Sequence, residues 1–145
     1  MNEKSNFNCE GRLVALDLFG CSFDSLNSPG FLLTEAKKAA EMARMTVLAI
    51  TVVPFSPQGL SIALTLSTSH LCLHSAPEYG YTAIDLFTCG PGDPMKAARH
   101  LIKALRPTVT RVKSQRRGVL PSSEKGKNRP LLLGEPSCLS ELRPS

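Results

Sequence analysis

The sequence predicts an α+β fold, a two-layer sandwich in which an antiparallel sheet carries helices on one face. Two observations lead to this class. Segments with strand or helix character follow the order strand, helix, four strands, helix, strand, and such runs of strands are typical of α+β domains. In addition, the apolar residues of the first helical segment recur at helical spacing, so that one of its faces can pack on a sheet.

Two helices are predicted. The first covers residues 31–44, follows a turn cluster at residues 27–30, and has Lys37, Lys38 and Glu41 on the face opposite its apolar residues. The second begins at Asp93 and Pro94, because aspartate is a good N-cap and proline suits the first helical position. It continues to about Leu105, and Pro107 stops it.

Six strands are predicted from runs of apolar, β-branched or alternating residues. Pro54, Pro57 and Gly59 break the chain between the second and the third strand. The predicted strands cover residues 12–18, 46–53, 60–66, 70–74, 81–88 and 108–113.

The chain length fits one domain, because 145 residues lie within the usual range of roughly 100–200. We expect this domain to span residues 1–117. Residues 118–145 are rich in proline, serine and charge, and we expect them to form a basic, mobile tail. The chain has no tryptophan and few aromatic residues, so its core must be aliphatic.

The apolar runs and the cysteine spacing predict the cellular compartment and the oxidation state of the thiols. Its apolar runs are shorter than the about 20 residues that span a bilayer, and residues 1–10 are too polar for a signal-peptide core. We therefore expect a cytoplasmic protein with no membrane partner. The five cysteines lack finger spacing and are expected to be free thiols. Four of them are interpreted as packed side chains: Cys9, Cys21, Cys72 and Cys138.

Positive charge concentrates in the second half of the chain. The net charge is +5, and the segment from Lys96 to Arg129 carries eleven bases against one acid, Glu124. Such a segment can mark a nucleic-acid-binding surface. The favoured interpretation is a solvated helix face followed by a basic tail, so no nucleic-acid partner is expected.

Reactive side chains gather between residues 67 and 90, and three interpretations compete there. His70, Cys72 and His74 alternate, so a strand would place them on one face as metal ligands. Alternate strand residues are about 6.6–7 Å apart and a fourth ligand is not evident, which disfavours a metal site. The second interpretation is that these are ordinary packed residues. The third is nucleophilic chemistry.

The third interpretation is supported by a family resemblance. The segment from Ser69 to Gly90 includes Pro-Glu-Tyr-Gly-Tyr at residues 77–81 and Leu-Phe-Thr-Cys-Gly at residues 86–90. It resembles the signature of the small prokaryotic S-adenosylmethionine decarboxylases, which are made as proenzymes. The likeness covers residues 11–117 and includes segments 11–12, 18–21 and 55–59, Ser61, and the helix that begins at Asp93.

The resemblance implies self-cleavage between Thr68 and Ser69. Ser69 would attack the Thr68 carbonyl to give an ester, and elimination would leave a pyruvoyl group at position 69. This cofactor would form a Schiff base with the substrate amine, and decarboxylated S-adenosylmethionine would serve spermidine biosynthesis. Decarboxylation needs an electron sink, and the reactive stretch has no lysine that could hold pyridoxal phosphate. The products would be a β chain, residues 1–68, and an α chain, residues 69–145.

Further roles follow from the same resemblance. His74 matches the proton acceptor in processing, and Ser61 a serine that assists it by hydrogen bonding. Cys89 matches the proton donor in catalysis, a task that suits a protonated thiol. Phe55 and Glu78 match substrate-binding positions, where an aromatic ring can attract a sulfonium cation and a carboxylate can bind ribose hydroxyls.

Several positions depart from the family pattern. Thr68 stands where glutamate is usual, Ala76 replaces a tryptophan, Val53 and Pro54 replace His-Arg, and Ile62 replaces a glycine. Ser69 and His74 are five residues apart, which places them on opposite faces of a regular strand. We therefore expect a bend or bulge near Ser69 that brings them together.

Assembly and two alternatives complete the expectations. The resemblance implies a homodimer of cleaved chains in which Phe55 and the pyruvoyl group of one site come from different subunits. One alternative keeps the pyruvoyl chemistry and changes the substrate to another amino acid, arginine or ornithine. The other makes the chain a non-catalytic homologue that acts as a partner or regulator.

Overall fold

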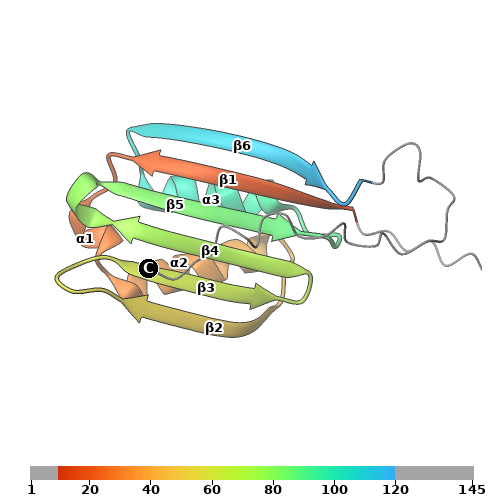
Figure 1. The fold of residues 1–145 in the computed structure, drawn as a ribbon, viewed down its shortest axis with the longest axis horizontal. Helices are drawn as coiled ribbons and strands as arrows, with labels where there is room; N and C mark the ends of the chain where they lie inside the picture. Colours follow the sequence, from red (N-terminus) through yellow and green to blue (C-terminus); the bar gives the residue numbers. More distant parts are fainter. Residues whose placement is uncertain (1–9, 120–145) are drawn as a thin grey trace, which may run out of the picture.

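The computed structural model describes residues 10–119 of the chain, and its elements from Gly11 to Arg117 form one sheet with helices on one side (Figure 1). The expected tail, apart from residues 118 and 119, lies outside the described residues, as do Cys9 and Cys138. The strands are β1 (Gly11–Phe19), β2 (Val47–Pro54), β3 (Leu60–Leu66), β4 (Ser69–Ala76), β5 (Tyr81–Thr88) and β6 (Val109–Arg117). The helical elements are α1 (Phe23–Leu26), α2 (Pro29–Met42), the 3₁₀ turn η1 (Pro77–Tyr79) and α3 (Pro94–Leu105).

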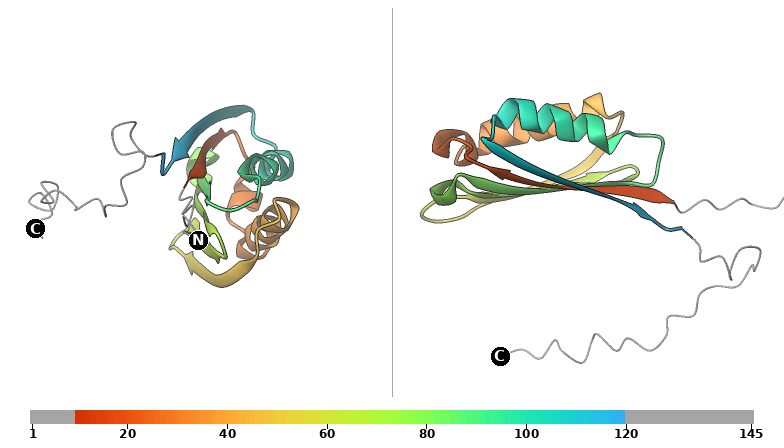
Figure 2. Two further views of the ribbon diagram at one scale, coloured as in Figure 1. Left: turned by 90° about the vertical axis from the view of Figure 1, so that its right-hand side faces the viewer. Right: turned by 90° about the horizontal axis from the view of Figure 1, so that it is seen from above.

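The six strands form one antiparallel sheet in the order β2-β3-β4-β5-β1-β6. Figure 2 shows α2 and α3 side by side on one face, with the edges of the sheet curving around them. The predicted α+β sandwich with helices on one face is therefore confirmed. Strands β3 and β5 have the bounds that the residue pattern predicted.

The helices begin where capping side chains fix them. Ser28 accepts a hydrogen bond from the Phe31 N–H, so α2 starts at Pro29, two residues before the predicted start. Asp93 accepts from the Met95 N–H and caps α3 as predicted. The patterns missed α1 and η1, because elements of three or four residues are too short to show a period.

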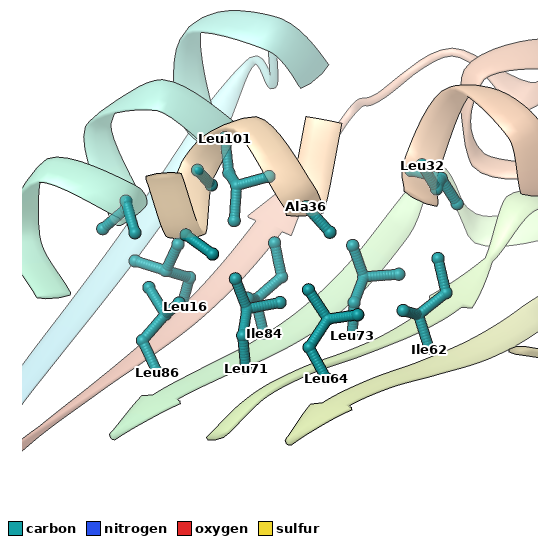
Figure 3. Packing of buried hydrophobic residues seen from close by; sticks show 14 of the residues in the cluster. Leu16, Leu32, Ala36, Ile62, Leu64, Leu71, Leu73, Ile84, Leu86 and Leu101 are labelled. Carbon is teal, nitrogen blue, oxygen red and sulfur yellow. The ribbon is translucent and has the colours of Figure 1, made fainter. Parts of the chain in front are cut away.

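The core lies between the sheet and the two long helices (Figure 3). Leucine and isoleucine side chains from the strands fill it, and alanines of α2 and α3 let the helix backbones come close. Each fully buried leucine contributes about 1.5–3 kcal/mol relative to an exposed one. The predicted aliphatic core is confirmed by its largest members: Leu16, Leu18, Leu26, Leu32, Leu60, Ile62, Leu64, Leu71, Leu73, Ile84, Leu86 and Leu101.

The opposite side of the sheet, which we name the open face, is not covered by any helix in the described part (Figure 2). Cross-strand neighbours share a face, so the register places a row from Lys113 through Ala15, Asp85 and Cys72 to Ala63 on it. A parallel row contains Arg111, Asp17, Ala83, His74 and Ser61.

Among the described residues, no helix has the length and apolar character needed to cross a bilayer.

Candidate active site

The Thr68–Ser69 peptide lies at the turn between β3 and β4. Leu66 pairs with Ser69, which leaves Ser67 and Thr68 as the two-residue connection. Ser69 also pairs with Thr88, the last residue of β5, so Cys89 follows directly beside the turn. Residues twenty positions apart in the sequence thus meet at one end of the sheet.

The Thr68 carbonyl oxygen is the focus of this cluster. It accepts a hydrogen bond from the Cys89 N–H at 3.0 Å and another from the Cys89 thiol at 3.1 Å. The Ser69 hydroxyl contacts the same oxygen and lies 3.6 Å from the Cys89 sulfur. Two donors on one carbonyl oxygen polarise the group and would stabilise negative charge that develops there, and a nucleophile lies next to it. We name Thr68, Ser69 and Cys89 the cleavage cluster.

His74 and Ser61 form a second group on the open face. The two residues pair across β4 and β3, and His74 Nδ1 is hydrogen bonded to Ser61 Oγ at 2.7 Å. His74 is exposed, so its ring can be reached from the side of the sheet that bears no helix.

The prediction of a bend or bulge near Ser69 is wrong. Ser69 has φ of +157°, yet β4 keeps continuous register with β3 and with β5 along its length. Five residues of regular strand separate Ser69 from His74 by about 16 Å and place them on opposite faces. The His74 ring therefore cannot reach Ser69 of the same chain.

Phe55 and Glu78 lie at the His74 end of the sheet. Phe55 directly follows β2, is half exposed, and donates its N–H to the Gly59 carbonyl at 2.8 Å. Gly59 has φ of +87°, and a Cβ there would meet the Ser75 carbonyl oxygen at 2.8 Å, so glycine lets this loop pack against the end of β4. Glu78 lies exposed in η1. We name Phe55, Ser61, His74 and Glu78, the residues at this end for which the resemblance implies roles in processing or substrate binding, the binding cluster.

The predicted site residues are thus divided between the two ends of the sheet. The cleavage cluster lies where β3 ends and β4 begins, and the binding cluster lies near the opposite ends of the same strands. Sequence reasoning missed Thr88, whose hydroxyl lies 3.1 Å from the Thr68 hydroxyl. A signal for it was present, since Thr88 continues the buried alternation of Ile84 and Leu86 with a polar side chain.

The pKa values of Cys21, Cys72 and Tyr81 are raised by their surroundings. Burial raises the pKa of the Cys21 thiol, and burial with the nearby Asp85 charge raises that of Cys72, so both thiols stay protonated. Tyr81 donates to Asp17 at 2.7 Å, and this hydrogen bond raises the pKa of Tyr81. Within residues 10–119, no three histidine, cysteine or acidic side chains are grouped closely enough to hold a metal ion.

A two-layer α+β sandwich with a serine, a cysteine and a polarised peptide carbonyl together at one end of its sheet has the features of a self-processing protein. The S-adenosylmethionine decarboxylase family model matches residues 12–118. The chain therefore belongs to the S-adenosylmethionine decarboxylase family.

Individual relatives agree with this assignment. The S-adenosylmethionine decarboxylase proenzyme of Brevibacillus brevis is 44% identical over 110 residues, which cover 75% of this chain and 83% of the relative. The proenzyme of the same name from Thermotoga maritima is 40% identical over 109 residues, 74% of this chain and 84% of the relative. The crystal structure of the adenosylmethionine decarboxylase from Aquifex aeolicus superposes with a TM-score of 0.74 at 25% identity, covering 79% of this chain and 96% of that one.

Proposed function

We propose that the chain is a proenzyme that cleaves itself between Thr68 and Ser69 and then decarboxylates S-adenosylmethionine. The observation that carries the proposal is the Thr68 carbonyl oxygen, which accepts from both the N–H and the thiol of Cys89 while the Ser69 hydroxyl contacts it. The names of the relatives above support the same reaction.

Self-cleavage begins when Ser69 Oγ attacks the Thr68 carbonyl carbon. Negative charge develops on the carbonyl oxygen, where the two Cys89 donors stabilise it. The C–N bond then breaks, the Ser69 nitrogen takes a proton, and an ester joins Thr68 to Ser69 Oγ. A base removes the Ser69 α-proton and the Thr68 carboxylate leaves. Water hydrolyses the resulting dehydroalanine, which releases ammonia and leaves a pyruvoyl group on the chain that begins at residue 69.

The pyruvoyl group would supply the electron sink for decarboxylation once the substrate amine joins it. The Ser69 position and its neighbours suit this group, because its precursor hydroxyl already contacts the carbonyl that it must attack. Cys89 lies beside the Ser69 position, with its sulfur 3.6 Å from Ser69 Oγ, and its thiol would return a proton to the substrate α-carbon. Phe55 would bind the sulfonium or the base of the substrate, and Glu78 the ribose hydroxyls.

The base for the α-proton comes from a second copy of the chain. His74 is about 16 Å along β4 from its own Ser69, whereas a general base must lie within hydrogen-bonding reach. If two open faces pack with a two-fold axis across the strands, the His74 end of each β4 lies over the Ser69 end of the other. The partner's ring then approaches the Ser69 backbone, which carries the α-proton, from the face opposite to the Ser69 side chain. One complete site then consists of one cleavage cluster and the partner's binding cluster.

Side chains on the open face suit such a homodimer. Charges of both signs lie on it, with Asp17 and Asp85 towards the middle and Arg111 and Lys113 along β6. The Arg111 guanidinium lies 5.5 Å from the centre of the Phe19 ring. A two-fold contact between the open faces would also cover the apolar side chains that lie on them.

The cytoplasm is the compartment in which this chemistry fits best, because the Cys89 thiol must stay reduced. The decarboxylated product would serve spermidine biosynthesis as an aminopropyl donor. The relatives reported above are named for S-adenosylmethionine, which favours that substrate over arginine or ornithine and favours an enzyme over a non-catalytic homologue.

Carbon dioxide release tests the substrate. Purified full-length protein is incubated separately with carboxyl-labelled S-adenosylmethionine, arginine and ornithine, and Ser69→Ala protein serves as the blank. We expect release from S-adenosylmethionine alone. Release from arginine or ornithine instead, or from none of the three by fully cleaved protein, contradicts the proposed substrate.

A further inference from the structure

Thr88 is a polar side chain in a core position, only 2% exposed. It ends β5 on the face that the helices cover, where Ile84 and Leu86 precede it at buried positions. A buried hydroxyl needs hydrogen-bonding partners, and Thr88 has two. Its Oγ1 accepts from the Gly90 N–H at 3.2 Å and lies 3.1 Å from the Thr68 Oγ1.

Gly90 holds the other side of Thr68. A Cβ on Gly90 would collide with Cγ2 of Thr68 and come within 2.9 Å of its Cβ, so the Thr68 side chain occupies the space that only a glycine leaves free. The Thr68 methyl group is therefore held by the Gly90 backbone and its hydroxyl by Thr88. We name Thr68, Thr88 and Gly90 the threonine clasp.

We propose that Thr88 is a positioning residue for self-cleavage, which holds Thr68 so that its carbonyl oxygen meets the Cys89 donors and the Ser69 hydroxyl. Threonine is branched at Cβ and has few χ1 choices, so fixing both its branches also fixes the backbone that carries the carbonyl. The same turn places that carbonyl 3.0 Å from the Cys89 N–H. Small errors in the placement of reacting groups are costly in rate.

The clasp accounts for a departure of this chain from the family pattern. The resemblance leads us to expect glutamate at position 68, and its long unbranched side chain lacks the paired methyl and hydroxyl that fit Gly90 and Thr88. In this chain the threonine fixes the scissile peptide through contacts with β5 and the residues that follow it. The inference rests on the proposed self-cleavage and adds the residue that positions it.

The test measures the cleavage rate of freshly synthesised full-length chains by intact mass. Thr88→Val replaces the hydroxyl with a methyl group of similar size, and we expect cleavage roughly 3- to 10-fold slower, as for the loss of one buried hydrogen bond. Thr88→Ser keeps the hydroxyl and is the matched control, expected within about two-fold of wild type. Thr68→Val removes the same hydrogen bond from its other end and should slow cleavage to a similar extent.

The double variant Thr68→Val/Thr88→Val decides whether the two hydroxyls act as a pair. It should cleave no more slowly than the slower single variant, because the hydrogen bond is already lost in each. Melting temperatures are compared in the uncleavable Ser69→Ala background, which separates slow cleavage from loss of the fold. If Thr88→Val does not fold, the same comparison is made with Thr68→Val and Thr68→Ser, since Thr68 is only half buried.

Two results overturn the inference while self-cleavage stands. In one, wild type cleaves and Thr88→Val cleaves as fast as Thr88→Ser. In the other, the effects of the two valine substitutions multiply in the double variant. If the wild-type chain itself stays whole, the proposed function fails first.

Discussion

Mixing two inactive variants tests whether His74 acts on Ser69 of another subunit. Ser69→Ala removes the nucleophile and His74→Ala removes the base, so each variant alone should remain uncleaved or, for His74→Ala, stop at the ester. In a mixed dimer, one site combines the intact Ser69 of the His74→Ala chain with the intact His74 of its partner. That site is complete, while the other lacks both groups.

The expected yield follows from the geometry. His74 is about 16 Å from Ser69 along the same strand, so in the proposed shared site the partner supplies the base. When equal amounts of the two chains pair at random, about half of all His74→Ala chains sit in mixed dimers. About half of these chains should therefore be cleaved, and Ser69→Ala chains not at all.

The assay is intact mass after the two chains are synthesised together, with a short tag to distinguish them. His70→Ala is the matched control, since His70 is a histidine on the same face of β4 and contacts the Phe87 ring at 5.8 Å between ring centres. It should cleave by itself. Cleavage of His74→Ala alone, or no cleavage in the mixture after dimers are shown to form, would refute the shared site.

Three further predictions concern the cleavage cluster, the binding cluster and the helix layer. Cys89→Ala keeps the N–H that donates to the Thr68 carbonyl and loses only the thiol donor, so it should still cleave, at a lower rate. Turnover per cleaved chain should fall by about 10²–10⁴, and normal turnover per cleaved chain would remove Cys89 from catalysis. Phe55→Ala should raise the KM for S-adenosylmethionine by roughly 2- to 30-fold if the ring contacts the sulfonium, and an unchanged KM contradicts that role. Hydrogen bonds from Lys38 and His100 lower the pKa of Glu35, so the folded state favours the carboxylate more than the unfolded state does. The resulting contribution to the free energy of unfolding should be lost as the pH falls through the lowered pKa. Melting temperatures are measured between about pH 6 and 3 for Ser69→Ala protein with and without Glu35→Gln. The melting temperature should change less with pH when Glu35→Gln is present, and an equal change in the two proteins would contradict the role of Glu35.

Local patterns predicted the elements because each depends on neighbours in the sequence. Alternation gave β3 and β5 their bounds, and the Asp93 cap with Pro94 marked the start of α3. Alternation also correctly placed Ser69 and His74 on opposite faces. The error lay in expecting a bend to bring them together, whereas β4 keeps continuous register with both of its neighbours.

Contacts between distant segments could not be predicted. The position of β1 between β5 and β6 depends on pairings such as Leu13 with Phe87 and with Gln115. The contact of Thr68 with Thr88 depends on the register of β4 and β5 together. A periodic pattern specifies which face a side chain takes and leaves open which strand lies beside it.

Self-cleavage is the central claim, and the intact mass of the purified full-length protein tests it most directly, with and without a hydrazine reagent. The account predicts two fragments. One ends at Thr68, and the other begins at position 69 with a mass lower by one ammonia than simple hydrolysis would give, and it takes up one hydrazine. Ser69→Ala protein should stay whole under the same conditions. Two results would contradict the account. One is a wild-type chain that stays whole after prolonged incubation, and the other is a fragment that begins with a free serine amine at residue 69 and does not react with the hydrazine.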